Sequence, residues 1–275
     1  GKGLQPLASF RSSWERDATF AAMKGGVSGG GHQHMDVGGF VIDADGLRWA
    51  SDAPSQSYDR EANAHAKAKA EGRPFEPAFY RDRWSHNILV VDGQKPVPGS
   101  QSPMLAFSDK PENPHVIFDL SPAYKGQLAQ AKRGLRLYRE RSVVVQDEFT
   151  TLGKDETQVR WAILTRNSPE LSKASISDDG KRLILRQSAK GVPEGKQPAT
   201  MEMRILSPAN ATFEVLVTNN QPYIHDYDRM SDSDRQVVIN LKLPADAMQT
   251  LTVHFRPGSV PADQPLPKVT PLSEW

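Results

Sequence analysis

The segment GLRLYRERSVVVQDEF (134–149) sets apolar and polar residues largely in alternation, which is the period of a β-strand with one buried face. Seven further segments share this character: HVIFDL (115–120), TQVRWAILTR (157–166), KRLILRQ (181–187), TMEMRI (200–205), TFEVLV (212–217), RQVVINLKL (235–243) and QTLTVHF (249–255). Turn-forming residues separate the segments, as at 178–181, 207–210 and 219–222. This succession favours an antiparallel β-sandwich over alternating strands and helices.

Two local elements and a tail complete the expected fold. Residues 40–50 predict a hairpin in which Gly46 supplies the positive φ of the turn. Residues 59–71 (DREANAHAKAKAE) predict one short inserted helix, because Ala and long side chains favour helix and Gly72 can end it. Five prolines in residues 257–275 predict an extended segment. We therefore expect one all-β sandwich domain over 1–256 and a Pro-rich tail over 257–275.

Composition excludes several classes of protein. Lys and Arg number 34 against 33 Asp and Glu, so the net charge of +1 provides no overall field that would attract nucleic acid or an anionic membrane. The absence of cysteine among 275 residues excludes disulfides, a thiolate metal site and a cysteine nucleophile. The apolar runs are far shorter than the ~20 residues of a membrane helix. We expect neither nucleic acid nor a membrane as a partner.

The densest signal for a site is the glycine-rich segment 25–39, which holds seven glycines and two histidines. His32 and His34, two residues apart, point to the same side of an extended chain. Asp52 ends the following strand and His86 opens another, so His34, Asp52 and His86 form a plausible zinc set with a fourth position left open. The alternative is a pair of surface histidines in a flexible loop.

Three stretches together carry a family resemblance: GGGHQHMDVGGFVIDADGLRWASD (29–52), SYDR (57–60) and YRDRWSHNILVVDG (80–93). They resemble the C-terminal catalytic β-domain of the heparinase II/III family of polysaccharide lyases, which includes related alginate lyases. The resemblance implies a large antiparallel β-sandwich with zinc ligands His34, Asp52 and His86. It implies that His32 is a catalytic histidine facing the substrate cleft and that Tyr58 is the active-site tyrosine. Tyr80 competes with Tyr58 for that role, although its position suggests a packing residue.

The resemblance also implies chemistry and partners. The reaction would be β-elimination beside a uronic acid, which requires neutralisation of the carboxylate, a base and an acid for the leaving oxygen. The substrate would be an acidic polysaccharide. Members of the family normally carry an N-terminal α/α toroid, and we expect this chain to lack it and to depend on one from the same precursor or a separate chain. We expect a periplasmic or secreted bacterial protein whose signal peptide is not present in the chain.

Two other functions stay open at this stage. A cupin would place a Glu ligand at position 38 or 39, and both are glycine. A non-catalytic carbohydrate-binding or structural sandwich would need no metal.

A basic cluster gives a weaker indication of an acidic polysaccharide partner. It comprises Lys132, Arg133, Arg136, Arg139 and Arg141. The alternative is that these residues form an ordinary solvated strand face.

Overall fold

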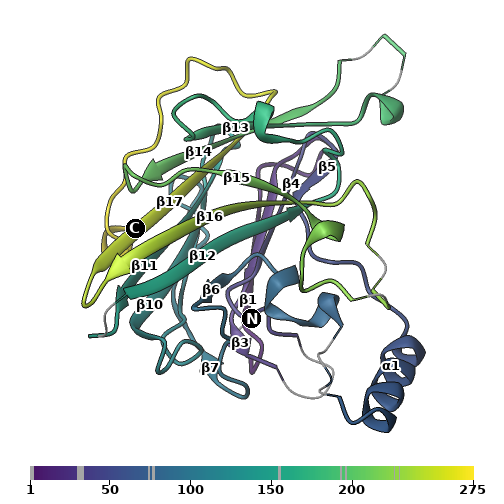
Figure 1. Ribbon diagram of the computed structural model, residues 1–275. Coiled ribbons are helices and arrows are strands. Elements are labelled where there is room, and N and C mark those ends of the chain that lie inside the picture. Colours follow the sequence, from purple (N-terminus) through teal and green to yellow (C-terminus); the bar gives the residue numbers. More distant parts are fainter. Residues whose placement is uncertain are drawn as a thin grey trace.

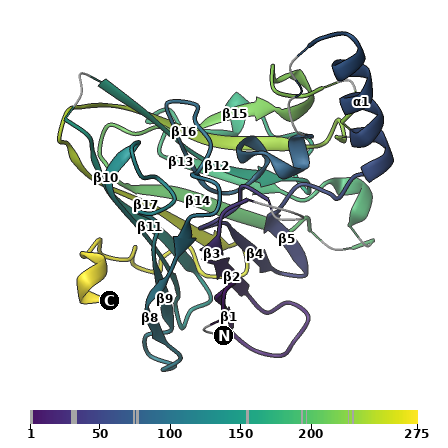
Figure 2. The same ribbon diagram turned by 90° about the horizontal axis from the view of Figure 1, so that it is seen from below.

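The computed structural model describes residues 3–29, 34–73, 75, 78–153, 156–192, 194–195, 197–225, 227–228 and 230–275. It contains one large antiparallel β-sandwich with a single projecting α-helix, as Figures 1 and 2 show. The predicted fold class is therefore confirmed. No helix in the described part of the chain is long and apolar enough to span a membrane.

One layer of the sandwich is a seven-stranded sheet. Its strands are, in spatial order, β13 (Arg182–Arg186), β14 (Thr200–Ser207), β17 (Met248–Pro257), β11 (Val143–Thr151), β10 (Leu128–Leu137), β9 (His115–Asp119) and β8 (Met104–Ser108). All of its pairings are antiparallel. The inner face is apolar and the outer face polar, as in β14, where Met201 and Met203 are fully buried beside Arg204.

Two four-stranded sheets form the other layer. The first has the order β1 (Leu7–Arg11), β2 (Phe20–Lys24), β4 (Phe40–Ala44) and β5 (Leu47–Ala50). The second has the order β15 (Glu214–Val217), β16 (Arg235–Pro244), β12 (Glu156–Thr165) and β6 (Leu89–Val91). A bridge between Ser51 and Leu164 joins the two sheets at the end of β5. The short strands β3 (Gly26–Val27) and β7 (Gln101–Ser102) pair with each other.

The core lies where the three large sheets meet. Phe40 of β4, Trp161 of β12 and Phe255 of β17 are all buried, and their ring centroids lie 6.0–6.4 Å apart. Each ring comes from a different sheet, so burial of these side chains stabilises the packing of the two layers, by about 2–3 kcal/mol per side chain.

The hairpin and the helix form where the sequence predicts them. Asp45 and Gly46 both have positive φ (54° and 77°) in the turn between β4 and β5. Helix α1 (Tyr58–Ala70) begins one residue before the predicted start, and Gly72 follows it with φ +66°. Only Glu61 and Ala68 of this helix are buried, which agrees with its projection away from the sandwich in Figure 1.

Short 3₁₀ turns complete the secondary structure. They are η1 (Phe79–Arg81), η2 (Arg83–Ser85), η3 (Lys173–Ser175), η4 (Ala189–Gly191), η5 (Thr218–Asn220) and η6 (Leu272–Glu274). The last lies in the Pro-rich segment after β17, where Leu272 packs onto the outer face of the seven-stranded sheet. The division into a domain and a tail stays a prediction.

Residues 134–149, expected as one strand segment, are in fact the end of β10 and most of β11. The chain reverses between them, where Tyr138 N–H donates to Ser142 O at 2.8 Å and Arg141 has φ +77°. The expectation was wrong because this turn contains no Gly, Pro, Asn or Asp to mark it.

Candidate functional site

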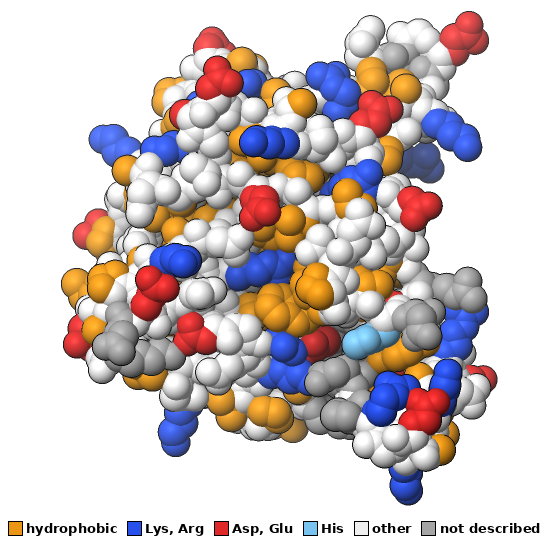
Figure 3. All heavy atoms as spheres, in the orientation of Figure 1, with side chains coloured by type: hydrophobic (Ala, Val, Ile, Leu, Met, Phe, Trp, Pro, Cys, Tyr) orange, Lys and Arg blue, Asp and Glu red, His pale blue; other side chains and the backbone are white. Residues whose placement is uncertain are grey.

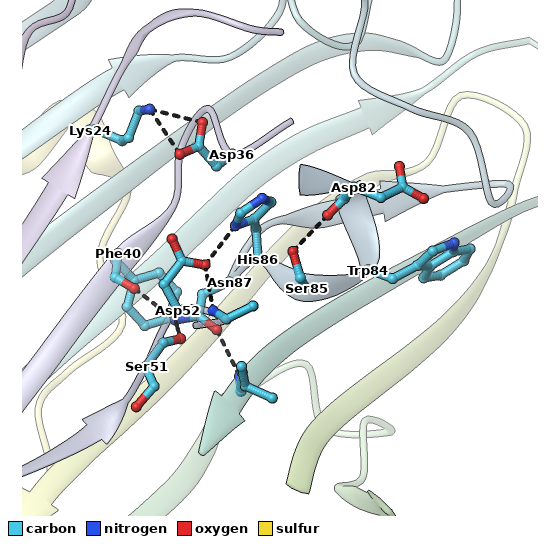
Figure 4. A network of polar contacts seen from close by, with 12 residues as sticks. Lys24, Asp36, Phe40, Ser51, Asp52, Asp82, Trp84, Ser85, His86 and Asn87 are labelled. Carbon is cyan, nitrogen blue, oxygen red and sulfur yellow. Dashed lines mark hydrogen bonds and ion pairs between the residues drawn. The ribbon is translucent and has the colours of Figure 1, made fainter. Parts of the chain in front are cut away.

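His86 and Asp52 are the centre of the candidate site. Asp52 follows β5 and His86 lies between η2 and β6, and the Nδ1 atom of His86 lies 2.6 Å from Oδ1 of Asp52 (Figure 4). The His86 side chain is 1% exposed, whereas that of Asp52 is 48% exposed. The other ring nitrogen of His86, Nε2, is buried and has no hydrogen-bond partner among the described residues. An unpartnered buried nitrogen of this kind is available to a ligand.

His34 lies directly against His86. Their ring centroids are 5.2 Å apart, and the rings of His34 and Tyr80 form a T-shaped pair with centroids 5.4 Å apart. Two backbone bonds hold this part of the loop: Gly29 N–H donates to His34 O, and Met35 N–H donates to Arg81 O. The loop therefore presents His34 to the beginning of β6.

Asp36 also belongs to the site, although no role for it was predicted from the sequence. Ligand atoms of His34, Asp36 and His86 all lie within 4.8 Å of one another. Both carboxylate oxygens of Asp36 accept hydrogen bonds from Lys24 Nζ, at 2.8 and 2.9 Å. The signal that could have identified Asp36 was its place two residues after His34, on the same side of an extended chain.

The ionisation of these groups follows from burial and charge. Burial and the nearby His86 lower the pKa of His34, which favours the neutral imidazole that binds metals. Burial alone would lower the pKa of His86, but the Asp52 carboxylate raises it. Desolvation would raise the pKa of Asp52, yet its interaction with His86 lowers it, so the carboxylate is ionised at neutral pH.

Asn87 holds the strands around the site in register. Its amide Nδ2 donates to Phe40 O at 2.7 Å and to Ser51 O at 2.8 Å, and its Oδ1 accepts from Leu164 N–H at 2.8 Å. One side chain thus joins β4, the end of β5 and β12. Because Asn87 follows His86 directly, these bonds also fix the position of the imidazole.

Arg133 of β10 holds the backbone of Asn87 in place through a hydrogen bond. Its Nη1 donates to Asn87 O at 2.7 Å and to Gly38 O at 2.9 Å, and its Nε and Nη2 bind the Asp147 carboxylate. The side chains of Arg133 and Asp147 have no exposed surface. Arg133 was expected in a basic surface patch, and this expectation was wrong because the partner on β11 allows its burial.

The two tyrosines lie at different depths. Tyr58 begins α1 and is 55% exposed, whereas Tyr80 is 3% exposed and its hydroxyl lies 3.3 Å from Glu61 Oε2. Burial and the Glu61 carboxylate raise the pKa of Tyr80, and Tyr58 is close enough to act in the same direction. Tyr80 is therefore a buried residue that packs against His34, whereas the Tyr58 side chain is exposed to solvent.

The surface at the site is only slightly hollowed. A cavity of about 120 Å³ borders His86, Asp52, Asp36, Lys24 and Asn87. Figure 3 shows histidine surface beside acidic and basic side chains, near the projection that carries α1. A volume of this size suits an ion or a few waters.

The family of the chain follows from its match to a model of a known protein family. The family model described as "Heparinase II/III-like, C-terminal" matches residues 5–252. The chain belongs to the heparinase II/III-like C-terminal family. No curated protein matches the chain.

Solved structures share the fold of this heparinase II/III-like domain. Heparinase III, the BT4657 gene product with methylated lysines, has a TM-score of 0.67 and 17% identity, covering 94% of this chain and 35% of that one. A mutant of the heparan sulfate lyase HepC from Pedobacter heparinus has a TM-score of 0.63 and 15% identity, covering 91% and 35%. The chain thus spans about a third of the length of these structures.

The structure places His86 of this domain against His34 and in contact with Asp52, but the ligand atoms that lie within 4.8 Å of one another are those of His34, Asp36 and His86. The assignment of Asp52 as a zinc ligand stays a prediction. His32 lies outside the described residues. Its role and the role of Tyr58 stay predictions.

Proposed function

We propose that this heparinase II/III-like domain is part of a polysaccharide lyase that cleaves an acidic, uronate-containing polysaccharide by β-elimination. Membership of the family supports the reaction class. The observation that carries the proposal is the buried His86, which contacts both Asp52 and His34 and has one ring nitrogen with no partner among the described residues.

We propose zinc as the resident metal, held by His34, Asp52 and His86. Two imidazoles and a carboxylate are the donor types that zinc takes in open sites. Asp36 lies as close to the two histidines, but Lys24 neutralises it by binding both of its oxygens, so we assign it to that ion pair. Asp52 is kept as the ligand because the family resemblance implies it, although its Oδ1 contacts His86 Nδ1 in this structure. When bound, zinc would supply a cross-link between the glycine-rich loop, the end of β5 and the start of β6.

The chain's own residues would perform the proton transfers. The proton beside a uronate carboxylate is weakly acidic, so the site needs donors that neutralise the carboxylate, together with a base and an acid. We propose His32 as the histidine facing the cleft and Tyr58 as the tyrosine that exchanges the proton. The exposed position of Tyr58 at the start of α1 is compatible with access to a polymeric substrate.

We propose that an N-terminal α/α toroid domain, in the same precursor or on a separate chain, forms the other wall of the cleft. The fact that the solved structures are about three times as long as the matched region is consistent with such a domain. We further propose a periplasmic or secreted location, because acidic polysaccharides are met there.

The test is an elimination assay with the protein at the full length that its gene encodes. Unsaturated uronate products absorb in the ultraviolet, and their formation is followed on a panel of uronate polysaccharides. Substitution of Tyr58 by Phe should lower the rate by a factor of about 10²–10⁴, the usual contribution of a general acid or base. The control, Tyr80→Phe, should lower it by less than tenfold. Loss of activity in the control alone would refute the Tyr58 assignment.

A further inference from the structure

Three arginines contact one glutamate on the outer face of the seven-stranded sheet. This sheet is not the layer that contains β5 and β6, next to which the candidate site lies. Glu202 of β14 accepts hydrogen bonds from Arg182 of β13 and, at 2.8 Å, from Arg204 Nε. Arg256 Nη2 of β17 lies 2.9 Å from the same carboxylate. Glu202 is 5% exposed, and although burial would raise its pKa, the arginines lower it, so it is ionised. We call these four residues the arginine cluster.

The charges of the arginine cluster do not balance. Three guanidinium groups face one carboxylate, and the nearby turn adds one acid, Asp179, and one base, Lys181. The strand register places Arg182 directly opposite Arg204. Like charges in directly opposite positions are destabilising. The three arginines, Lys181, Glu202 and Asp179 together carry a net charge of +2, which an added anion would offset.

Hydrogen-bond donors in the cluster are unused as well. Arg182 and Arg204 each bind Glu202 through Nε, and no described residue accepts a bond from their Nη atoms. His254 lies opposite Arg204 on β17, is 3% exposed, and has no partner for either ring nitrogen among the described residues. Among the described residues, the Nη donors of Arg182 and Arg204 therefore have no acceptor, whereas Arg256 Nη1 donates to Pro261 O at 3.3 Å.

Two hollows flank Arg182. One, of about 290 Å³, lies between the cluster and residues 257–262, which run beside β14 and β17 in Figure 1. The other, of about 370 Å³, lies towards residues 170–177 and also borders Arg186. Arg182, with 43% of its side chain exposed, and Ile184 line both hollows, so the hollows and the arginine cluster form one furrow. Glu170 also lines the second hollow and offsets the charge of Arg186.

We propose that the arginine cluster is a second binding site, which holds sulfate or carboxylate groups of an acidic saccharide away from the His34–His86 site. The planar guanidinium fork matches the paired oxygens of these groups. The furrow offers room for sugar rings on both sides of the anion. The choice of a saccharide rests on the proposed function, whereas the preference for an oxyanion rests on the cluster itself.

The test is isothermal titration calorimetry with a heparin-derived tetrasaccharide and with inorganic sulfate, both in EDTA. Substitution of Arg182 and Arg204 by Gln should weaken tetrasaccharide binding at least tenfold. The control, Lys110→Gln with Lys242→Gln, removes the same charge at exposed positions and should change it less than twofold. Because no metal or turnover is involved, the result does not depend on the zinc proposal.

A second variant keeps the test decisive if the double variant does not fold. Substitution of Glu202 by Gln removes the competing carboxylate, so it should strengthen tetrasaccharide binding three- to tenfold. Unchanged or weaker binding would show that the cluster is a purely structural network and would overturn the proposal. Equal affinity for inorganic sulfate and the tetrasaccharide would overturn the assignment to a saccharide.

Discussion

Arg133 and Asp147 form a bidentate ion pair between β10 and β11, with N–O distances of 2.7 and 3.0 Å and no exposed surface on either side chain. The same guanidinium donates to the carbonyl oxygens of Gly38 and Asn87. The pair therefore links the seven-stranded sheet to both segments that carry the candidate ligands His34 and His86.

Substitution of Arg133 by Met should destabilise the domain by about 3–5 kcal/mol, because it leaves the Asp147 carboxylate buried without a counter-charge. Urea unfolding measures this loss. Arg139→Met is the matched control, since Arg139 is an exposed arginine in the following turn, and its effect should stay within about 0.5 kcal/mol. Equal effects in both variants would contradict the role given to the buried pair.

Substitution of Asn87 by Ala should cost about 3 kcal/mol, because three backbone groups of β4, the end of β5 and β12 lose their partner at about 1 kcal/mol each. It should also weaken zinc binding about 10- to 100-fold, as loss of a residue that positions a ligand does. Asn167→Ala removes a single side-chain bond among the described residues, the one to Arg48 O, and should cost about 1 kcal/mol without changing metal affinity. Zinc titration of both variants separates the two effects.

The segment after β17 should detach when Gly134 is replaced by Ala. A Cβ at Gly134 would lie 2.5 Å from Leu272 Cδ2 and 2.8 Å from Trp275 Cζ3, and Leu272 is 2% exposed. We expect a loss of about 1–3 kcal/mol and faster proteolysis of residues 258–275. In a chain shortened to end before Lys268, the same substitution should cost almost nothing. A full cost in the shortened chain would show that the strain arises elsewhere.

His254 should make the domain less stable in acid. Burial, together with the positive charge of Arg256, lowers its pKa to about 4, whereas the unfolded value is near 6.5. Between these values the unfolded chain binds more protons, so stability falls as pH decreases from about 6.5 to 4, by roughly 3 kcal/mol in total. Melting temperatures of the His254→Gln variant should show less of this fall than the wild type. The exposed control His65→Gln should follow the wild type, and identical pH profiles in all three would refute the assignment.

The sequence was sufficient for the architecture because strand alternation and turn residues are local signals. The Asp45–Gly46 turn and the α1 helix ended by Gly72 could both be predicted from a few adjacent residues. The turn at 138–142 could not, because it forms without the residues that usually mark one.

The surroundings of the site depend on pairings between distant segments. A basic residue is exposed by default, and the burial of Arg133 follows only from the register that sets it opposite Asp147. In the same way, the ion pair between Lys24 and Asp36 forms only because the glycine-rich loop folds back against the end of β2. The ligand candidates could be found from their chemistry and the family resemblance, whereas the residues that position them required the fold.

The most direct test of the central claim is the zinc content of the purified domain by elemental analysis, after incubation with zinc and dialysis. We expect about one zinc per chain, with His34→Ala, His86→Ala and Asp52→Asn losing it and Asp36→Asn retaining it. Absence of zinc from the wild type, or its unchanged retention in the His34 and His86 variants, would contradict the account.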